Sequence, residues 1–260
     1  SCKYPWGLDD AVDDPSGRKK FGHYADDASA FAWLREGAPA GRLCIEAQVM
    51  DLADDIAYSV HDFEDAIVEG YIDVPEIGER ADHDALVRGM ARWVGGGVPA
   101  DELAAAFDRL DSIEAWPTSW DGGRGDRGRL KNLASSLIGR FVSAAQRATR
   151  EAHGQHALAR YGADVVVPAE TRAEIAVLKG IVGSYVMSNI GRQPVYVRQR
   201  AVLVELADRL YEIGSGHLDV DFQAEWDAAP DDAARKRVIV DQVASLTDQN
   251  ANTWHSLLVG

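Results

Sequence analysis

The sequence predicts an all-α fold, and three observations lead to this prediction. Apolar residues recur at steps of three and four along several long segments, which is the spacing of one buried helix face. Proline lies near the start and glycine at the end of several of these segments, where a helix tolerates each of them. Strand signals are scarce, and "ADVVVP" (163–168) is the only good strand candidate. We therefore expect a chain built mainly of helices.

The first part of the chain changes from loops to helices near residue 45. Residues 1–42 are rich in glycine, proline and aspartate, and we expect loops there with one short helix at 26–36. The segment 45–70 has the clearest amphipathic pattern and predicts a long helix that ends near a glycine. Two further helices are expected at 76–94 and 99–112, on either side of a "GGGVP" connection.

The rest of the chain also reads as helices separated by loops. Residues 116–128 read as a loop because of their glycine, proline and aspartate content, and a long helix is expected at 129–151. Pro168 marks the start of a helix that we expect to stop at Gly191. Residues 193–212 form the next predicted helix, and one last helix is expected after Pro230.

Composition limits the classes of function. Hydrophobic residues make up 46% of the chain and charged residues 27%, as in an ordinary globular protein. The net charge of -15 disfavours a role on nucleic acid or on an anionic membrane, because both need a basic surface. No apolar run approaches the ~20 residues that span a bilayer. Only Cys2 and Cys44 are present, so we expect a reducing, cytoplasmic location.

The segment 45–69 carries an unusual number of carboxylates. Asp54, Tyr58 and Asp62 are spaced i, i+4, i+8, so they stack along one helix face over ~12 Å, with Asp51 close to the same line. A solvated helix face is one interpretation, and a Mg²⁺ or Mn²⁺ site is the other, because these ions prefer oxygen ligands. Eight acidic and no basic residues lie in this segment: Glu46, Asp51, Asp54, Asp55, Asp62, Glu64, Asp65 and Glu69.

The stretch "EAQVMDLADDIAYSVHDFEDAI" (46–67) resembles the helix that carries the last metal-ligand aspartate of the deoxyguanosine triphosphate triphosphohydrolases, a branch of the HD-domain superfamily. Further segments resemble that family in the same order: "KYPW" (3–6), "KFGHY" (20–24), "LKNLASSLIGRF" (130–141) and "DQVASLTDQNA" (241–251). The resemblance implies an HD-domain-like helical array. Residues 1–151 are then the C-terminal part of the HD-type catalytic core, and 152–260 a helical region that packs on it.

The resemblance also implies a role for each residue of the stacked face. Asp54 matches the family's metal-ligand aspartate, and Tyr58 and Asp62 match positions that line the deoxyribose pocket. An acceptor carboxylate suits the 3′-hydroxyl, and a flat ring under the sugar leaves no room for a 2′-hydroxyl. Candidate contacts to the triphosphate are Lys131 and Arg140, with Lys3 and Lys20 as weaker candidates and surface charges as the alternative.

The implied reaction is hydrolysis of a deoxynucleoside triphosphate, such as dGTP, to the deoxynucleoside and tripolyphosphate. It depends on Mg²⁺ or Mn²⁺, which lowers the pKa of the attacking water and offsets charge on the phosphoryl oxygens. The family's other ligands, a His and a His-Asp pair, precede the aspartate. Here His61-Asp62 and His83-Asp84 both follow Asp54, and His23 lies in a segment of the wrong type. We therefore expect the C-terminal part of a longer enzyme, inactive alone.

Two other functions stay open. One is a non-catalytic helical module that assembles with or regulates a partner, and the other is HD chemistry on a different nucleotide or a phosphodiester. A homo-oligomer is expected from the resemblance. The base preference and any allosteric nucleotide are not readable from these residues.

Overall fold

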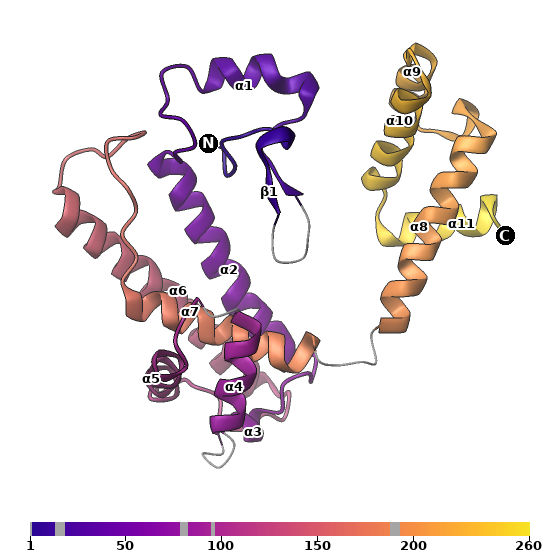
Figure 1. Ribbon diagram of the computed structural model, residues 1–260. Coiled ribbons are helices and arrows are strands. Elements are labelled where there is room, and N and C mark those ends of the chain that lie inside the picture. Colours follow the sequence, from indigo (N-terminus) through magenta and orange to yellow (C-terminus); the bar gives the residue numbers. More distant parts are fainter. Residues whose placement is uncertain (1, 14–18, 79–82, 95–96, 188–192) are drawn as a thin grey trace. The chain divides into compact units, whose positions relative to one another are not determined.

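The computed structural model of the protein describes residues 2–13, 19–78, 83–94, 97–187 and 193–260. The chain divides into two compact units, Ser1–Ser188 and Asn189–Gly260, which are described separately below (Figure 1). The prediction of an all-α fold is confirmed, because helices account for most of the described residues. Among those residues, no helix is both long enough and apolar enough to cross a membrane.

Unit 1 begins with a small irregular region and continues as a set of packed helices (Figure 1). Strands β1 and β2 pair antiparallel for two residues each, with Val12 opposite Lys20. The elements are the 3-10 turns Leu8–Asp10 and Ala25–Asp27, β1 (Val12–Asp13), β2 (Lys19–Lys20), α1 (Ala28–Leu34), α2 (Ile45–Val68), α3 (Val74–Gly78), α4 (His83–Val94), α5 (Ala100–Asp111), α6 (Arg124–His153), α7 (Ala169–Val182) and a π-helical turn at Gly183–Met187.

Helix α7 lies at the centre of unit 1, in contact with α2, α4, α5 and α6. Its side chains are buried on nearly every side, and Val177, Leu178 and Ile181 are fully inaccessible to solvent. Helix α2 contributes a second apolar surface, on which Phe63 stacks against Trp116 with a ring-centroid distance of 5.2 Å. Full burial of each large apolar side chain stabilises the fold by about 1.5–3 kcal/mol, so this cluster fixes how α2 lies against α7.

The described residues of unit 2, 193–260, form four α-helices with a core of their own. Leu206 and Leu210 of α8 are fully buried against Val238 and Ile239 of α10. The side chains of Asp231 and Thr247 cap the N termini of α10 and α11, with acceptor distances of 2.8 Å and 3.3 Å to backbone amides. The elements are α8 (Gln193–Ile213), a 3-10 turn at Ser215–His217, α9 (Val220–Ala228), α10 (Asp232–Ser245) and α11 (Asp248–Leu258).

Several predicted elements are confirmed, and others are corrected. The helices predicted at 26–36, 45–70, 99–112 and 129–151 correspond to α1, α2, α5 and α6, although α6 begins five residues earlier within the predicted loop. The strand predicted at 163–168 is wrong, because this segment forms no strand and two of its amides bond side chains instead. The amide of Val165 donates to Oε1 of Gln48 at 2.8 Å, and that of Val166 to Oγ1 of Thr149 at 2.9 Å.

Three helix boundaries also differ from prediction. The segment 76–94 contains α3 and α4, with 79–82 outside the described residues, and the helix from Pro168 ends at Val182 before the π-helical turn, with 188–192 not described. The last predicted helix is two helices, because Thr247 starts α11 with a new cap, and α9 was not predicted. The chain divides into its two compact units after Ser188, and the proposed limit of the catalytic core at residue 151 stays a prediction.

Candidate functional site

The exposed face of α2 carries the three residues that the sequence singled out. Asp54, Tyr58 and Asp62 lie on one uninterrupted helix, and their spacing places them one above the other on its surface. All three are exposed, and the Tyr58 side chain is 61% accessible to solvent. The opposite side of the helix holds Ile56 and Phe63 in the core. The predicted stack therefore exists as an accessible surface.

Lys3, from the N-terminal segment, lies over one end of this face. Its Nζ atom is 2.5 Å from Oδ1 of Asp51 and 3.4 Å from Oδ2 of Asp54. The hydrogen bond to Asp51 raises the pKa of Lys3 above its usual range, with a further contribution from Asp54, so the ammonium stays charged. Two carboxylates of α2 thus share one cation that comes from a distant part of the sequence.

Two other lysines approach α2 from the neighbouring helices. Nζ of Lys179, on α7, lies 2.8 Å from Oδ1 of Asp55, and Nζ of Lys131, on α6, lies 2.6 Å from Oε1 of Glu64. Glu64 is buried, and the other oxygen of its carboxylate has no hydrogen-bond partner among the described residues, although His61 Nδ1 lies 3.4 Å away. Four carboxylates of α2 are therefore paired with lysines through tertiary contacts rather than with neighbours in sequence.

Asp62 differs from these carboxylates, because no cation from the described residues pairs with it through a hydrogen bond or ion pair. Its pKa is raised, chiefly by partial burial and also by the like charge of Asp65, while His61 acts in the opposite direction. A carboxyl group in this state accepts a hydrogen bond when ionised and donates one when protonated. Asp62 is therefore available to bond a ligand.

The side chains of this chain do not make a metal site by themselves. Within the described residues, no three His, Cys, Asp or Glu side chains come together to hold an ion, and the cation beside Asp54 is Lys3. His23 Nδ1 lies 2.9 Å from the carbonyl oxygen of Tyr24, and His61 lies beside Glu64. The side chains of His83 and Asp84 fall outside the described part. Asp54 alone offers one of the several ligands that a divalent ion needs.

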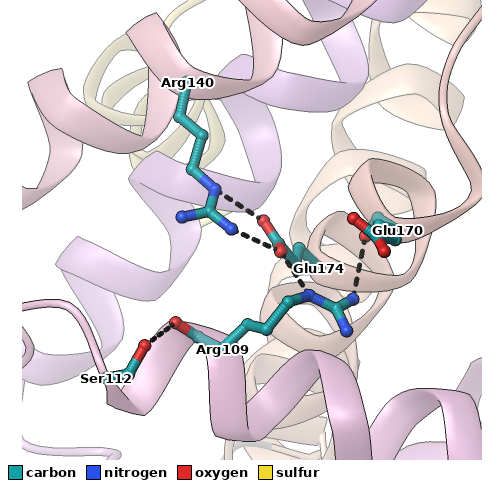
Figure 2. Close-up of polar contacts among 5 residues, drawn as sticks. All are labelled: Arg109, Ser112, Arg140, Glu170 and Glu174. Carbon is teal, nitrogen blue, oxygen red and sulfur yellow. Dashed lines mark hydrogen bonds and ion pairs between the residues drawn. The ribbon is translucent and has the colours of Figure 1, made fainter.

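Arg140 lies in a different polar cluster (Figure 2). Its guanidinium bonds the carboxylate of Glu174 with two hydrogen bonds, at 2.7 Å and 3.0 Å. Arg109, on α5, donates to the same carboxylate at 2.8 Å and to the carbonyl of Glu170 at 3.4 Å. Glu174 is 2% exposed, so this carboxylate joins α5, α6 and α7 inside unit 1. Of the two main candidates for triphosphate contacts, the structure brings Lys131 to α2 and gives Arg140 a partner on α7.

A pocket of about 580 Å³ adjoins the acidic face between α2, α4 and α7. Asp51 and Asp55 line one wall, and Lys179 and Arg172 of α7 line another, beside the half-exposed ring of Trp93. The sequence analysis did not identify Lys179 or this pocket. The available signal was weak: Lys179 is a single lysine in the otherwise apolar second half of α7. Its partner Asp55 lies far away in the sequence.

Comparison with known proteins gives the same family along the whole chain. Residues 165–257 match the phosphohydrolase-associated domain. The chain is 48% identical to a deoxyguanosinetriphosphate triphosphohydrolase-like protein of Streptomyces coelicolor, over 100% of this chain and 61% of that protein. It is 41% identical to the protein of the same name from Bifidobacterium longum (99% and 55%) and 37% identical to one from Corynebacterium glutamicum (95% and 58%).

The chain therefore spans a little over half the length of these curated relatives. The matches cover both units, including the acidic face of α2 and the helices that supply its lysines. By sequence and by its all-α fold, the chain is a homologue of the deoxyguanosinetriphosphate triphosphohydrolase-like proteins.

Proposed function

We propose that the chain forms the deoxyribose-binding part of an enzyme that hydrolyses deoxynucleoside triphosphates to the deoxynucleoside and tripolyphosphate. One observation carries this proposal: Asp62 lies exposed beside Tyr58 on the face of α2 and lacks a cationic partner among the described residues, whereas Asp51, Asp54, Asp55 and Glu64 each have a lysine. The names of the relatives support the same reaction class.

In this proposal the sugar packs on the ring of Tyr58, and Asp62 bonds its 3′-hydroxyl. The exposed ring offers an apolar surface for the sugar, and a 2′-hydroxyl pressed against that surface would lose its hydrogen bonds to water. This arrangement selects deoxynucleotides over ribonucleotides.

The phosphates need cationic partners, and Lys131 is the first candidate. Its side chain is 70% exposed although its ammonium bonds Glu64, so it keeps donors free for a phosphate oxygen. Lys3 and Lys20 are further candidates. Arg140 also stays a candidate, although Glu174 occupies two of its donor groups.

We also propose that Mg²⁺ or Mn²⁺ binds at Asp54, with the remaining ligands coming from residues outside this chain. Such an ion lowers the pKa of a bound water and offsets charge on phosphoryl oxygens. Because the described residues lack a complete ligand set, the chain alone is expected to show no turnover.

The test uses a protein of the full length of the relatives, incubated with dGTP and the other deoxynucleoside triphosphates in Mg²⁺ or Mn²⁺. Chromatography is expected to show deoxynucleoside and tripolyphosphate, and Asp54→Ala is expected to abolish both. Glu69→Gln, at the end of the same helix, is the control and should keep wild-type turnover. The absence of turnover for every nucleotide with both metals would refute the proposal.

A matched substrate pair tests the role of Asp62. Asp62→Asn is expected to lower kcat/KM for dGTP by about tenfold or more, because a hydrogen bond to a charged acceptor is lost. The same change should leave the much lower kcat/KM for 2′,3′-dideoxy-GTP nearly unaltered, because that substrate has no 3′-hydroxyl. An equal loss for both substrates would exclude the proposed contact.

A non-catalytic assembly role is the second candidate, and the surface of unit 2 favours it. Helix α8 exposes several apolar side chains: Val195, Tyr196, Val197, Leu203 and Val204. Exposed apolar patches of this kind often mark protein interfaces, and a homo-oligomer is the expected assembly. Analytical ultracentrifugation of the wild type and of Val197→Lys tests this proposal: a smaller assembly in the variant supports it, and a monomeric wild type contradicts it.

A further inference from the structure

A second pocket lies between α6 and the N-terminal turn of α7, within unit 1. Its volume is about 430 Å³, which is in the range of small-molecule sites. Arg140 and Arg147 of α6 line one side, and Pro168 and Thr171 of α7 line the other. The pocket is lined by none of the residues of the acidic face of α2, and Arg140 is the one lining residue that is also a candidate for the triphosphate contacts named above.

The two arginines give the pocket a supply of hydrogen-bond donors. Arg147 is exposed and makes no hydrogen bond or ion pair with a described residue. Arg140 uses Nε and Nη2 on Glu174, which leaves Nη1 free of described partners and holds the guanidinium in a fixed plane (Figure 2). Because Arg109 also bonds Glu174, two positive charges oppose the single buried negative charge there. The guanidinium plane of Arg140 is therefore preorganised to meet an oxyanion.

The α7 side of the pocket supplies two further kinds of donor. Helix α7 begins after Pro168, and no side chain caps its N terminus. The backbone amides of its first turn can therefore donate to a ligand, and the positive end of the helix dipole favours an anion there. Thr171 also lines the pocket, and because no described residue bonds its hydroxyl, that hydroxyl can donate to a ligand there.

We propose that this pocket binds the phosphoryl group of a small phosphorylated ligand. Guanidinium groups, a hydroxyl and the amides of a helix N terminus are the donors that proteins use for phosphate oxygens. Three carboxylates also line the pocket. Glu174 is paired with Arg140 and Arg109, whereas the exposed carboxylates of Glu151 and Glu170 weaken the binding of an anion. This site lies apart from the acidic face of α2 and does not depend on the proposed hydrolysis, although both draw on Arg140 as a candidate.

The test is a calorimetric titration of this 260-residue chain with inorganic tripolyphosphate, and separately with inorganic phosphate, in EDTA. EDTA removes divalent ions, and no hydrolysis is needed for the measurement, so the result does not depend on the proposed activity. We expect saturable binding of tripolyphosphate. Arg147→Ala and Thr171→Val should each weaken it, the former by about tenfold or more because a charge-assisted hydrogen bond is lost.

Matched variants test whether tripolyphosphate binds in this pocket. Glu151→Gln with Glu170→Gln should tighten binding, because two negative charges leave the pocket. Lys179→Ala removes a lysine beside the α2 face that has no role in the proposed hydrolytic site, and Arg200→Ala removes an exposed arginine of unit 2; both variants should bind as the wild type does. The proposal is overturned if the chain binds no tripolyphosphate at millimolar concentration. It is equally overturned if Arg147→Ala and Thr171→Val bind normally, or if the lysine variant loses binding.

Discussion

Nζ of Lys131 lies 2.6 Å from Oε1 of Glu64, which joins an exposed cation on α6 to a buried carboxylate on α2. Removal of the lysine leaves that carboxylate in the interior, and His61 is then its one ion-pair partner among the described residues. We expect Lys131→Ala to lower the free energy of unfolding by about 1–3 kcal/mol, the usual cost of an unsatisfied buried polar group. Urea unfolding followed by tryptophan fluorescence measures this change.

Lys179→Ala is the matched control for that prediction. Lys179 also pairs with a carboxylate of α2, but both partners of this pair are partly exposed, so its loss should change stability by about 1 kcal/mol or less. Glu64→Gln added to Lys131→Ala should restore part of the lost stability, because it removes the buried charge. Equal losses for the two lysine variants would show that burial of Glu64 does not matter.

Glu174 is expected to be more important for stability than any single partner of its cluster. Its carboxylate accepts from Arg109 and Arg140 and ties three helices together (Figure 2). Glu174→Ala should lower the free energy of unfolding by about 3 kcal/mol or more, because a buried partner is lost and two arginines lose their acceptor. Glu174→Gln, which keeps an acceptor oxygen, should lose less. A Glu174→Ala protein as stable as the wild type would contradict this prediction.

The contact between α4 and α7 depends on Gly180. A Cβ atom at this position would lie 2.7 Å from Cβ and 3.1 Å from Cα of Met90, which is closer than packed carbon atoms approach. Gly180→Ala should therefore lower the free energy of unfolding by about 1–3 kcal/mol through overpacking. Gly139→Ala, in α6 with open space around the new methyl group, should instead raise it by up to about 1 kcal/mol. The melting temperatures of the two variants should shift in opposite directions.

Asp62 should make stability depend on pH with a definite sign. Burial and Asp65 raise the pKa of Asp62, so the folded protein binds a proton more tightly than the unfolded chain does. Its contribution to stability therefore falls as pH rises from the ordinary aspartate pKa of about 3.9 through the raised value. We expect Asp62→Asn to be more stable than the wild type at neutral pH, with the gain disappearing below pH of about 3.9.

Two measurements check this prediction. Urea unfolding of both proteins across the acidic range gives the difference in stability at each pH. NMR titration of the Asp62 carboxyl carbon gives its pKa directly, and Asp65→Asn should bring that pKa closer to the ordinary value. A gain in stability for Asp62→Asn that grows toward low pH would contradict the sign.

The elements that the sequence predicted best are those whose own apolar spacing defines a buried face. Helices α2 and α6 are of this kind, and Ile56, Phe63 and Leu137 lie in the core as their spacing requires. The predicted strand at 163–168 failed because Val165 and Val166 favour an extended backbone, but a strand also needs a neighbour. Gln48 and Thr149 bond these amides instead, and neither partner is visible from the segment itself.

In the candidate site, too, some residues can be placed from local sequence and others cannot. The stack of Asp54, Tyr58 and Asp62 follows from residues spaced four apart on one helix, so local sequence is enough to place it. The cations that neutralise its neighbours are Lys3, Lys131 and Lys179, which come from three segments far apart in the chain. Only the packing of α6 and α7 on α2 determines which carboxylate each helix lysine reaches, and no local pattern encodes that choice.

The central position of α7 has a consequence for how the two parts of this sequence evolve. The phosphohydrolase-associated domain begins at residue 165, so it includes α7, whose side chains fill the core of unit 1. A cut before Val165 would remove the helix that α2, α4, α5 and α6 contact and would expose their apolar surfaces. The domain that sequence comparison delimits is therefore not the unit that folds. The two parts must evolve together, because a foreign replacement for either one would have to match the same interior.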